Sequence, residues 1–270
     1  MRSNYNIIAS GPKEFYLEKD SRARVFEEWA KLLGMYSDRQ LTKSSDKLPA
    51  LSGLAKIYSE RLKDHYIAGL WRNSLVEGLS WTTFGPGVRR VPEYRAPSWS
   101  WASIDGYISA NELPLCSHEA AILDCHVELK GSNPFGEVSS GWIKLRALLV
   151  PLFLNEKIDP DGFGVPYAKN PLARTENGDP NGTYSRFDID FSNITMEGAQ
   201  DLVRSMGSKK LYALMLGKTT EDDELSYFSL IVTPTEAGPY TMQRLGYIVQ
   251  NENCMGPLDA ASEKPIITLV

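Results

Sequence analysis

The first third of the chain has the hydrophobic pattern of amphipathic helices. Between residues 24 and 36, apolar side chains recur three and four positions apart, which places them on one face of a helix. The same spacing predicts a second helix over about 46–62, with Pro49 in its first turn, where proline is tolerated. It also predicts a third helix over about 66–79. We therefore expect residues 1–82 to form a helical part.

After residue 82 the pattern becomes that of β-strands. Gly85, Pro86 and Gly87, with the prolines that follow them, interrupt any helix. From about residue 98, apolar and polar side chains alternate, which is the period of a half-buried strand. The predicted strands are 122–129, 142–153, 187–191, 211–216, 227–232, 240–249 and 265–270. Helices followed by strands predict a single α+β unit, 1–270, in which the helical third packs on a mostly antiparallel, barrel-like β-unit over 83–270.

One long segment interrupts this β-rich part. Residues 155–183 are rich in Gly, Pro, Asn and Asp, which favour turns over regular structure. We expect a mobile surface loop here. Connections of this length are uncommon in compact domains, where they are either functional or disordered.

Composition and charge exclude several classes of protein. The hydrophobic content of 42% is typical of a globular chain, and the net charge of −5 lacks the basic excess of a nucleic-acid-binding protein. Three cysteines are too few for a disulfide framework. The first 16 residues lack the apolar run of a signal peptide, and no stretch reaches the ~18 apolar residues of a membrane span. We expect a cytoplasmic protein that binds neither nucleic acid nor membrane.

Three segments in the first hundred or so residues are distinctive. They are Trp29 followed by residues 36–42 (YSDRQLT) and 46–55 (DKLPALSGLA), residues 66–71 (YIAGLW) with LSW at 79–81, and residues 95–103 (RAPSWSWAS). In this order and spacing they resemble the region that follows the HET domain in fungal heterokaryon-incompatibility proteins. Later segments agree more loosely, among them Arg244-Leu245-Gly246-Tyr247. The resemblance implies a protein of a filamentous fungus.

The resemblance does not extend to the effector of the family. In the family, the HET domain resembles a TIR-type fold, carries the cell-death signal and lies upstream of these motifs. The present sequence contains nothing like the upstream signature of that domain. The resemblance therefore implies a module without a death-inducing or nucleotide-cleaving activity, and the family does not define the biochemistry of this module.

The tryptophans are the first candidates for a functional site. Trp71, Trp99 and Trp101 lie in the family-like segments. Trp99 and Trp101 share one face if their segment is extended, with Ser98 and Ser100 on the other face. Such aromatic side chains usually fill a core, where they bury a large apolar surface. The alternative is that they are the walls of a substrate pocket, since ligand sites are mostly apolar with a few polar groups.

Three polar residues near these tryptophans are the candidates for chemistry. Arg95 and Asp105 flank the tryptophan pair, and His65 precedes the segment of Trp71. An Arg–Asp ion pair would simply pin the loop. In the alternative interpretation, Arg95 polarises a substrate carbonyl and either Asp105 or His65 transfers a proton.

No motif for a metal or a cofactor is present in the sequence. Cys116, His118, Cys125 and His126 are suitable residue types for zinc, but Cys125 and His126 point to opposite faces of a strand and no Cys-x-x-Cys spacing occurs. The sequence also lacks a P-loop, a GxGxxG turn and a GxSxG elbow. We expect neither a metal nor a cofactor.

Two functions from different classes remain. The first is a cofactor-independent enzyme of fungal specialised metabolism, a cyclase, isomerase or pericyclase that folds a small, largely apolar metabolite between the three tryptophans. The second is a non-catalytic recognition module whose 155–183 loop and exposed strand edges contact a protein partner. Because a module without its effector has lost the reason to signal, the context favours the enzyme.

Overall fold

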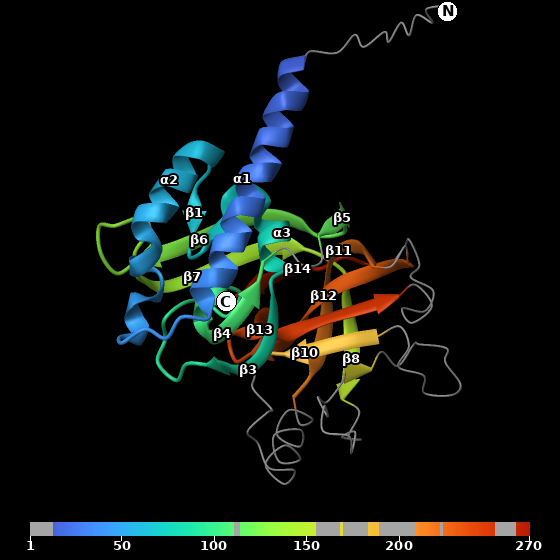
Figure 1. Ribbon diagram of the computed structural model, residues 1–270. Helices are drawn as coiled ribbons and strands as arrows, with labels where there is room; N and C mark the ends of the chain where they lie inside the picture. Colours follow the sequence, from blue (N-terminus) through green and yellow to red (C-terminus); the bar gives the residue numbers. More distant parts are fainter. Residues whose placement is uncertain are drawn as a thin grey trace, which may run out of the picture.

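The computed structural model describes residues 13–110, 114–154, 168–169, 183–188, 209–221, 224–251 and 263–270. The fold is mixed α+β, with a few helices beside a large sheet of mostly antiparallel strands that curls into a half-barrel (Figure 1). The α-helices are α1 (Lys13–Ser37), α2 (Ser52–Leu62) and α3 (Leu75–Leu79). Short 3₁₀ turns are η1 (Ser44–Lys47), η2 (Pro49–Leu51), η3 (Arg72–Ser74) and η4 (Trp101–Ser103).

Helix α1 contains the predicted helix 24–36 and begins earlier, at Lys13. The prediction of a second helix over 46–62 is confirmed only from Ser52 onward, because the 3₁₀ turns η1 and η2, which include Pro49, precede α2. Val25, Trp29 and Leu33 recur at helical spacing and are buried on one face of α1. The two helices lie side by side at one end of the molecule, with Arg61 of α2 bonded to Glu28 of α1 (Figure 1). In the described ranges, no helix combines the length and the apolar character needed to cross a membrane.

The prediction of a third helix over 66–79 is wrong. Strands β1 (Tyr66–Ile67) and β2 (Leu70–Trp71) pair in a hairpin with a two-residue turn. The turn η3 and the short helix α3 follow the hairpin. The turn residues Ala68 and Gly69 have φ values of 43° and 99°, which a right-handed helix cannot contain. The helical third is therefore only partly helical, although the apolar stripe that suggested the helix is buried as expected.

Within the described residues, the large sheet contains ten strands. They are β5 (Leu115–His118), β6 (Ala121–Leu129), β7 (Val138–Arg146), β8 (Leu149–Leu154), β9 (Ala168–Lys169), β10 (Thr183–Phe187), β11 (Leu211–Glu221), β12 (Glu224–Thr235), β13 (Gly238–Asn251) and β14 (Ile266–Leu269). Their order is β6-β7-β14-β13-β12-β11-β8-β9, with β10 paired to β13 and β5 to β11. Every described pairing is antiparallel except β13–β14.

A separate hairpin connects the helices to this sheet. Strands β3 (Thr82–Arg90) and β4 (Ile104–Ser109) pair with each other, and β4 packs on α1. The connection between them, residues 91–103, contains the tryptophan pair. Of the long segment 155–183 that the sequence predicts to be a loop, all but residues 168, 169 and 183 lie outside the described residues.

The sheet buries side chains on both faces. Along β12, Phe228 and Leu230 face the main core, which also contains the apolar side chains of the helices. Ile231, the residue after Leu230, faces the other side, as the two-residue period of a strand requires. A second apolar cluster lies on that side and consists of Val150, Leu152, Phe187, Leu211, Ala213, Met215, Ile231 and Ile248. We call this side the second face of the sheet.

Candidate functional site

The three candidate tryptophans are all buried in the main core. The indole rings of Trp71 and Trp29 lie 5.1 Å apart between centroids in an edge-to-face arrangement. The Trp101 indole N–H donates to the carbonyl oxygen of Gly69 at 2.9 Å. Trp99 accepts at its carbonyl oxygen from the indole N–H of Trp81, also at 2.9 Å. These contacts join α1, the hairpin β1–β2, the residue before β3 and the 91–103 connection.

Two of the three candidate tryptophans line a small cavity. Trp71 and Trp101 form its wall together with side chains of α1, whereas Trp99 does not contact it. The cavity volume is about 10 Å³, which is about the minimum for one water molecule. Ligand pockets for small molecules measure roughly 300–1,000 Å³. In this conformation the tryptophans fill the space between α1 and the hairpins and leave no room for a metabolite.

The connection that contains Trp99 and Trp101 is not a simple extended segment. Trp101 opens the 3₁₀ turn η4, and both Ser98 and Ser100 are buried rather than solvent-facing. The Ser100 hydroxyl donates to the carbonyl oxygen of Ala68 at 2.6 Å and accepts from the backbone N–H of Ala102. Because each serine bonds a distant backbone, the segment is a junction between parts of the fold.

Arg95 and Asp105 form the ion pair that the sequence suggested. The Arg95 Nη1 lies 2.9 Å from the Asp105 Oδ1. The remaining nitrogens of Arg95 donate to the carbonyl oxygens of Ala102 at 2.5 Å and of Ile104 at 2.7 Å, and Nη1 also donates to the Ser44 hydroxyl at 2.8 Å. All three guanidinium nitrogens are thus used to fix the 91–103 connection against the turn before α2.

His65 is separate from this ion pair. Its side chain is exposed, and among the described residues no hydrogen bond or ion pair joins it to Arg95 or Asp105. The neighbouring Asp64 is buried instead, and its carboxylate accepts from Arg22 at 2.7 Å and from the backbone N–H of Asn73. The predicted catalytic set is therefore not assembled, and none of its three members lines the cavity.

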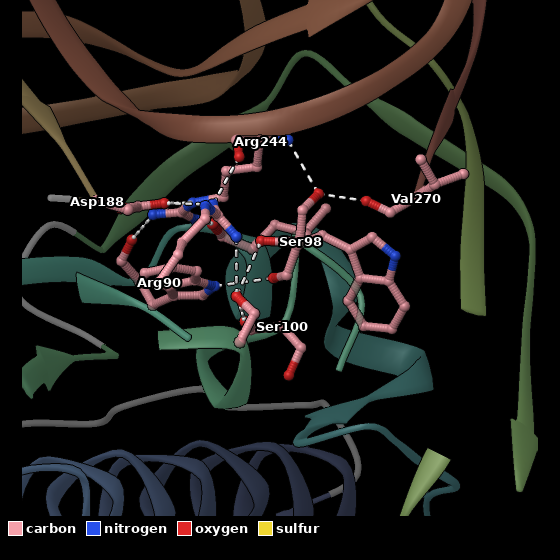
Figure 2. Close-up of polar contacts among 10 residues, drawn as sticks. Arg90, Ser98, Ser100, Asp188, Arg244 and Val270 are labelled. Atoms are coloured by element: carbon pink, nitrogen blue, oxygen red, sulfur yellow. Dashed lines mark hydrogen bonds and ion pairs between the residues drawn. The ribbon is translucent and has the colours of Figure 1, made fainter. Parts of the chain in front are cut away.

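A buried cluster of Arg90, Asp188 and Arg244 is the principal site that sequence reasoning missed (Figure 2). The Asp188 Oδ2 accepts from the Arg244 Nε and from the Arg90 Nη2, each at 3.1 Å. The Arg244 guanidinium also donates to the carbonyl oxygens of Leu79 at 2.9 Å and Trp81 at 2.8 Å. Its central carbon lies 3.2 Å from the centroid of the Trp81 ring, which is a cation–π contact.

The same cluster ties down the strand β13 and the residue Val270. The backbone N–H of Arg244 donates to the Ser98 hydroxyl at 3.0 Å, and that hydroxyl donates to the Val270 oxygen (Figure 2). Arg90 donates to the carbonyl oxygen of Arg244 at 2.6 Å. Five distant segments therefore meet at one point, which we call the arginine junction.

The arginine junction places two arginines around one carboxylate. Burial lowers the pKa of both arginines, and the Asp188 carboxylate opposes that shift. Arginine nevertheless stays protonated in proteins, so two positive charges face one negative charge. The backbone carbonyl oxygens around Arg244 offset the excess, because charge-assisted hydrogen bonds are stronger than neutral ones.

Comparisons with protein-family models, with curated proteins and with solved structures find no match for this chain. Its function is therefore inferred from its own residues. The geometry shows a candidate site whose aromatic and ionic groups are bonded to each other and to the backbone.

Lys47 is expected to make the stability of the fold rise with pH above neutrality. Its side chain is buried, and its ammonium donates to the carbonyl oxygen of Ser37 at 3.0 Å. Burial, with a smaller contribution from Arg95, lowers the pKa of Lys47 to about 8, from 10.5 in the unfolded chain. Between these values the unfolded state binds the extra proton, so deprotonation favours the folded state.

We expect the free energy of unfolding to rise by about 2 kcal/mol between pH 8 and pH 10, relative to Lys47→Met. Urea unfolding at intervals of one pH unit measures this difference. Other groups that titrate in this range affect both proteins alike. Parallel curves for the two proteins would contradict the buried, shifted lysine.

Proposed function

We propose that this chain is a cytosolic recognition module, related to the region that follows the HET domain in heterokaryon-incompatibility proteins, and that it binds a helix of a partner protein without catalysis. The observation that carries the proposal is an exposed apolar stripe that begins in the turn η2 and continues along α2. Leu54 and Ile57 are 42% and 52% exposed, and Ala50 and Gly53 are exposed beside them. The four residues follow the spacing i, i+3, i+4, i+7 of one helix face.

This outer stripe is separate from the face that α2 buries. Leu51, Ala55 and Leu62 point into the main core. The stripe lies on another side of the helix, where the charged residues Glu60 and Arg61 are also exposed. Single exposed apolar side chains are normal, but an apolar face about two turns long is typical of a helix that packs on another helix.

Gly53 favours a helical partner over a strand or a loop. A Cβ atom at this position would meet no atom within 4 Å, so the surface above it is open. Helix axes approach each other more closely where a side chain is missing. An amphipathic helix would therefore pack with a large side chain above Gly53, between Leu54 and Ile57.

The enzyme is the second candidate, and it is favoured by one observation. Trp71 and Trp101, two of the predicted walls, do line a cavity. A metabolite would require α1 to move away from the hairpins, since the present cavity volume is about 10 Å³. Of the polar groups assigned to the chemistry, Arg95 and Asp105 are bonded to each other, and the exposed His65 does not line the cavity. Saturable quenching of tryptophan fluorescence by a metabolite, lost in Trp101→Phe, would revive this function.

The recognition function predicts that Ile57→Glu abolishes partner binding and leaves the fold intact. An exposed substitution changes the free energy of unfolding by less than about 0.5 kcal/mol, whereas a charge in an apolar contact weakens binding at least tenfold. A photo-cross-linking residue is placed at position 57 of the chain, inside the cells in which the protein naturally occurs. The protein that becomes cross-linked to it is the partner. The purified partner is then titrated against both proteins by calorimetry.

Tyr240→Glu is the matched control, because Tyr240 is equally exposed but belongs to β13. Cross-linking from position 57 and not from position 240, followed by a selective loss of affinity in Ile57→Glu, is the expected result. Identical cross-linking from the two positions, or equal affinities for the two variants, would rule out α2 as the contact surface.

A further inference from the structure

The connection between α1 and the turn η1 presents an exposed hydroxyl to a buried arginine. Residues 38–40 and 42–45 are exposed, and Ser44 is the first residue of η1. The Ser44 Oγ accepts from the Arg95 Nη1 at 2.8 Å, and the Ser44 carbonyl oxygen accepts from the same nitrogen at 3.3 Å. The Arg95 side chain itself is only 4% exposed. An enzyme in solution can therefore reach the hydroxyl, while the cation behind it stays in place.

The hydroxyl hydrogen of Ser44 can be replaced without loss of a contact. Within the described part of the chain the Ser44 Oγ only accepts, and no hydrogen bond has it as the donor. The Ser103 hydroxyl also accepts from an arginine, Arg90, but it is buried and donates to the carbonyl oxygen of Ser100. Ser44 thus combines access from solvent with a neighbouring guanidinium, and Ser103 does not.

The charges around Ser44 favour an anion. In the segment 38–47 basic side chains outnumber acidic ones, and Arg95 adds a further positive charge at the Ser44 Oγ. The acidic neighbour is Asp105, which lies 2.9 Å from the Arg95 Nη1. Asp105 has a second partner, since its other oxygen lies 3.5 Å from the Nε of Arg89 on the paired strand β3. Arg95 can therefore be shared with a new anion at Ser44 without leaving Asp105 unpaired. The charged side chains of the segment are Asp38, Arg39, Lys43, Asp46 and Lys47.

A phosphate ester is the modification that suits this geometry. Phosphoserine carries a charge of about −1.5 to −2 at neutral pH and has three acceptor oxygens. On Ser44 these oxygens lie one bond beyond an atom that already contacts Arg95. A guanidinium binds phosphate through parallel N–H donors, and such charge-assisted hydrogen bonds are stronger than neutral ones. Acylation or glycosylation of the same hydroxyl brings no charge to the guanidinium and gains no contact of this kind.

We propose that Ser44 is a phosphorylation site and that Arg95 is the receptor of its phosphate, so that the modification fastens η1 to the 91–103 connection. A protein kinase transfers the γ-phosphoryl group of ATP to the Ser44 Oγ. The Oγ–P bond forms, the bond from the γ-phosphorus to the bridging oxygen breaks, the hydroxyl proton passes to the base of the kinase, and ADP leaves. The proposal is independent of the recognition function, because it concerns Ser44 and not the stripe that begins in η2.

The first experiment asks whether the phosphate is present in the cells in which the protein naturally occurs. The full chain is isolated with phosphatase inhibitors, half of it is then treated with a phosphatase, and the peptides of both halves are sequenced by mass spectrometry. We expect a phosphate on Ser44 that the phosphatase removes. Phosphate on the neighbouring Thr42 or Ser45 alone, or no phosphate in this segment, would overturn the proposal.

The second experiment measures the contact with Arg95 and uses Ser45 as the matched control. Ser45 is exposed like Ser44, and in the described ranges no hydrogen bond joins it to an arginine. Phosphoserine is incorporated at either position of the recombinant full chain, and phosphorus NMR follows each phosphate against pH. Because a nearby guanidinium favours the dianion, we expect the second pKa of the phosphate on Ser44 to lie about one unit below that on Ser45. Lys43→Gln is expected to keep this difference, because the receptor is Arg95 and not the adjacent lysine.

Thermal unfolding of the same proteins completes the test, because a phosphate that bridges two segments stabilises the folded state. At pH 8, where the phosphate is a dianion, we expect phosphorylation of Ser44 to raise Tm by about 3 °C. Phosphorylation of Ser45 is expected to leave Tm unchanged. Equal pKa values for the two phosphates, a difference that disappears in Lys43→Gln, or a lower Tm with phosphorylated Ser44 would each overturn the role of Arg95 as the receptor.

Discussion

Arg244→Ala is expected to lower the free energy of unfolding by about 3–5 kcal/mol. The substitution leaves the buried carbonyl oxygens of Leu79 and Trp81 without their donors, and each orphaned acceptor costs about 1–3 kcal/mol. It also removes the guanidinium from the face of the Trp81 ring and leaves a cavity at a point where distant segments meet. Urea unfolding followed by tryptophan fluorescence measures the loss.

Two matched variants separate the geometry of the junction from its charge. Arg244→Lys keeps the positive charge but cannot reach Asp188 and both carbonyl oxygens at once, because an ammonium lacks the planar fork of a guanidinium. We expect it to lose about 2 kcal/mol or more. Arg89→Ala removes an arginine side chain that is 74% exposed and is expected to cost less than about 0.5 kcal/mol.

A loss of less than about 1 kcal/mol in Arg244→Ala would contradict the role assigned to the arginine junction. It would mean that water replaces the guanidinium between the strands and α3. The double variant with Asp188→Asn distinguishes these cases, since residues that act as a unit show a coupling energy of about 0.5–3 kcal/mol.

Burial was easier to predict from the sequence than the identity of the elements. The apolar stripe from Ile67 to Leu79 is buried as its spacing indicates, but Ala68 and Gly69 turn the backbone through positive φ values and replace the first turns of the expected helix by a hairpin. A short apolar run is compatible with a strand or a helix, so turn chemistry decides between them. An Ala-Gly pair is a weaker hairpin signal than Asn-Gly. The helical spacing of the apolar residues therefore dominates the pattern and predicts a helix instead of the hairpin.

The candidate site was predictable only where its partners are close in sequence. Arg95 and Asp105 are ten residues apart in the same connection, and their pairing follows from that proximity. Arg90 and Asp188 are 98 residues apart, and Arg90 and Arg244 are 154 apart. Asp188 follows Phe187 where apolar and polar residues alternate, and this alternation predicts a carboxylate that faces solvent. No residue nearby in the sequence indicates that Asp188 is buried.

Several candidate residues for catalysis and substrate binding have structural contacts that the sequence does not show. The groups that looked available for catalysis, Arg95 and the tryptophans, hold the 91–103 connection in place. Ser44, whose hydroxyl accepts from Arg95, lies in a polar stretch that predicts its exposure. Arg95 is 51 residues away in the sequence, so no local pattern indicates that the two side chains meet.

The rigidity of the tryptophan packing can be tested at Gly69. Its φ of 99° strains any other residue, and a Cβ atom added there would lie 2.5 Å from the Nε1 of Trp101. That nitrogen is itself bonded to the Gly69 carbonyl oxygen, so the indole cannot withdraw without losing the bond. We expect Gly69→Ala to lower the free energy of unfolding by about 3 kcal/mol or more, measured by urea unfolding.

Gly53→Ala is the matched control, and its effect has the opposite sign. Gly53 lies in α2 with open space around it, so alanine raises the stability by up to about 1 kcal/mol through helix propensity. The comparison also bears on function. If Trp101 were the mobile wall of a substrate pocket, its ring would shift into the adjacent cavity, and Gly69→Ala would cost little beyond the backbone strain of about 1 kcal/mol. A large loss, relieved in part by Trp101→Phe, means instead that the tryptophans are fixed core residues, and binding must then use the other surfaces of the molecule.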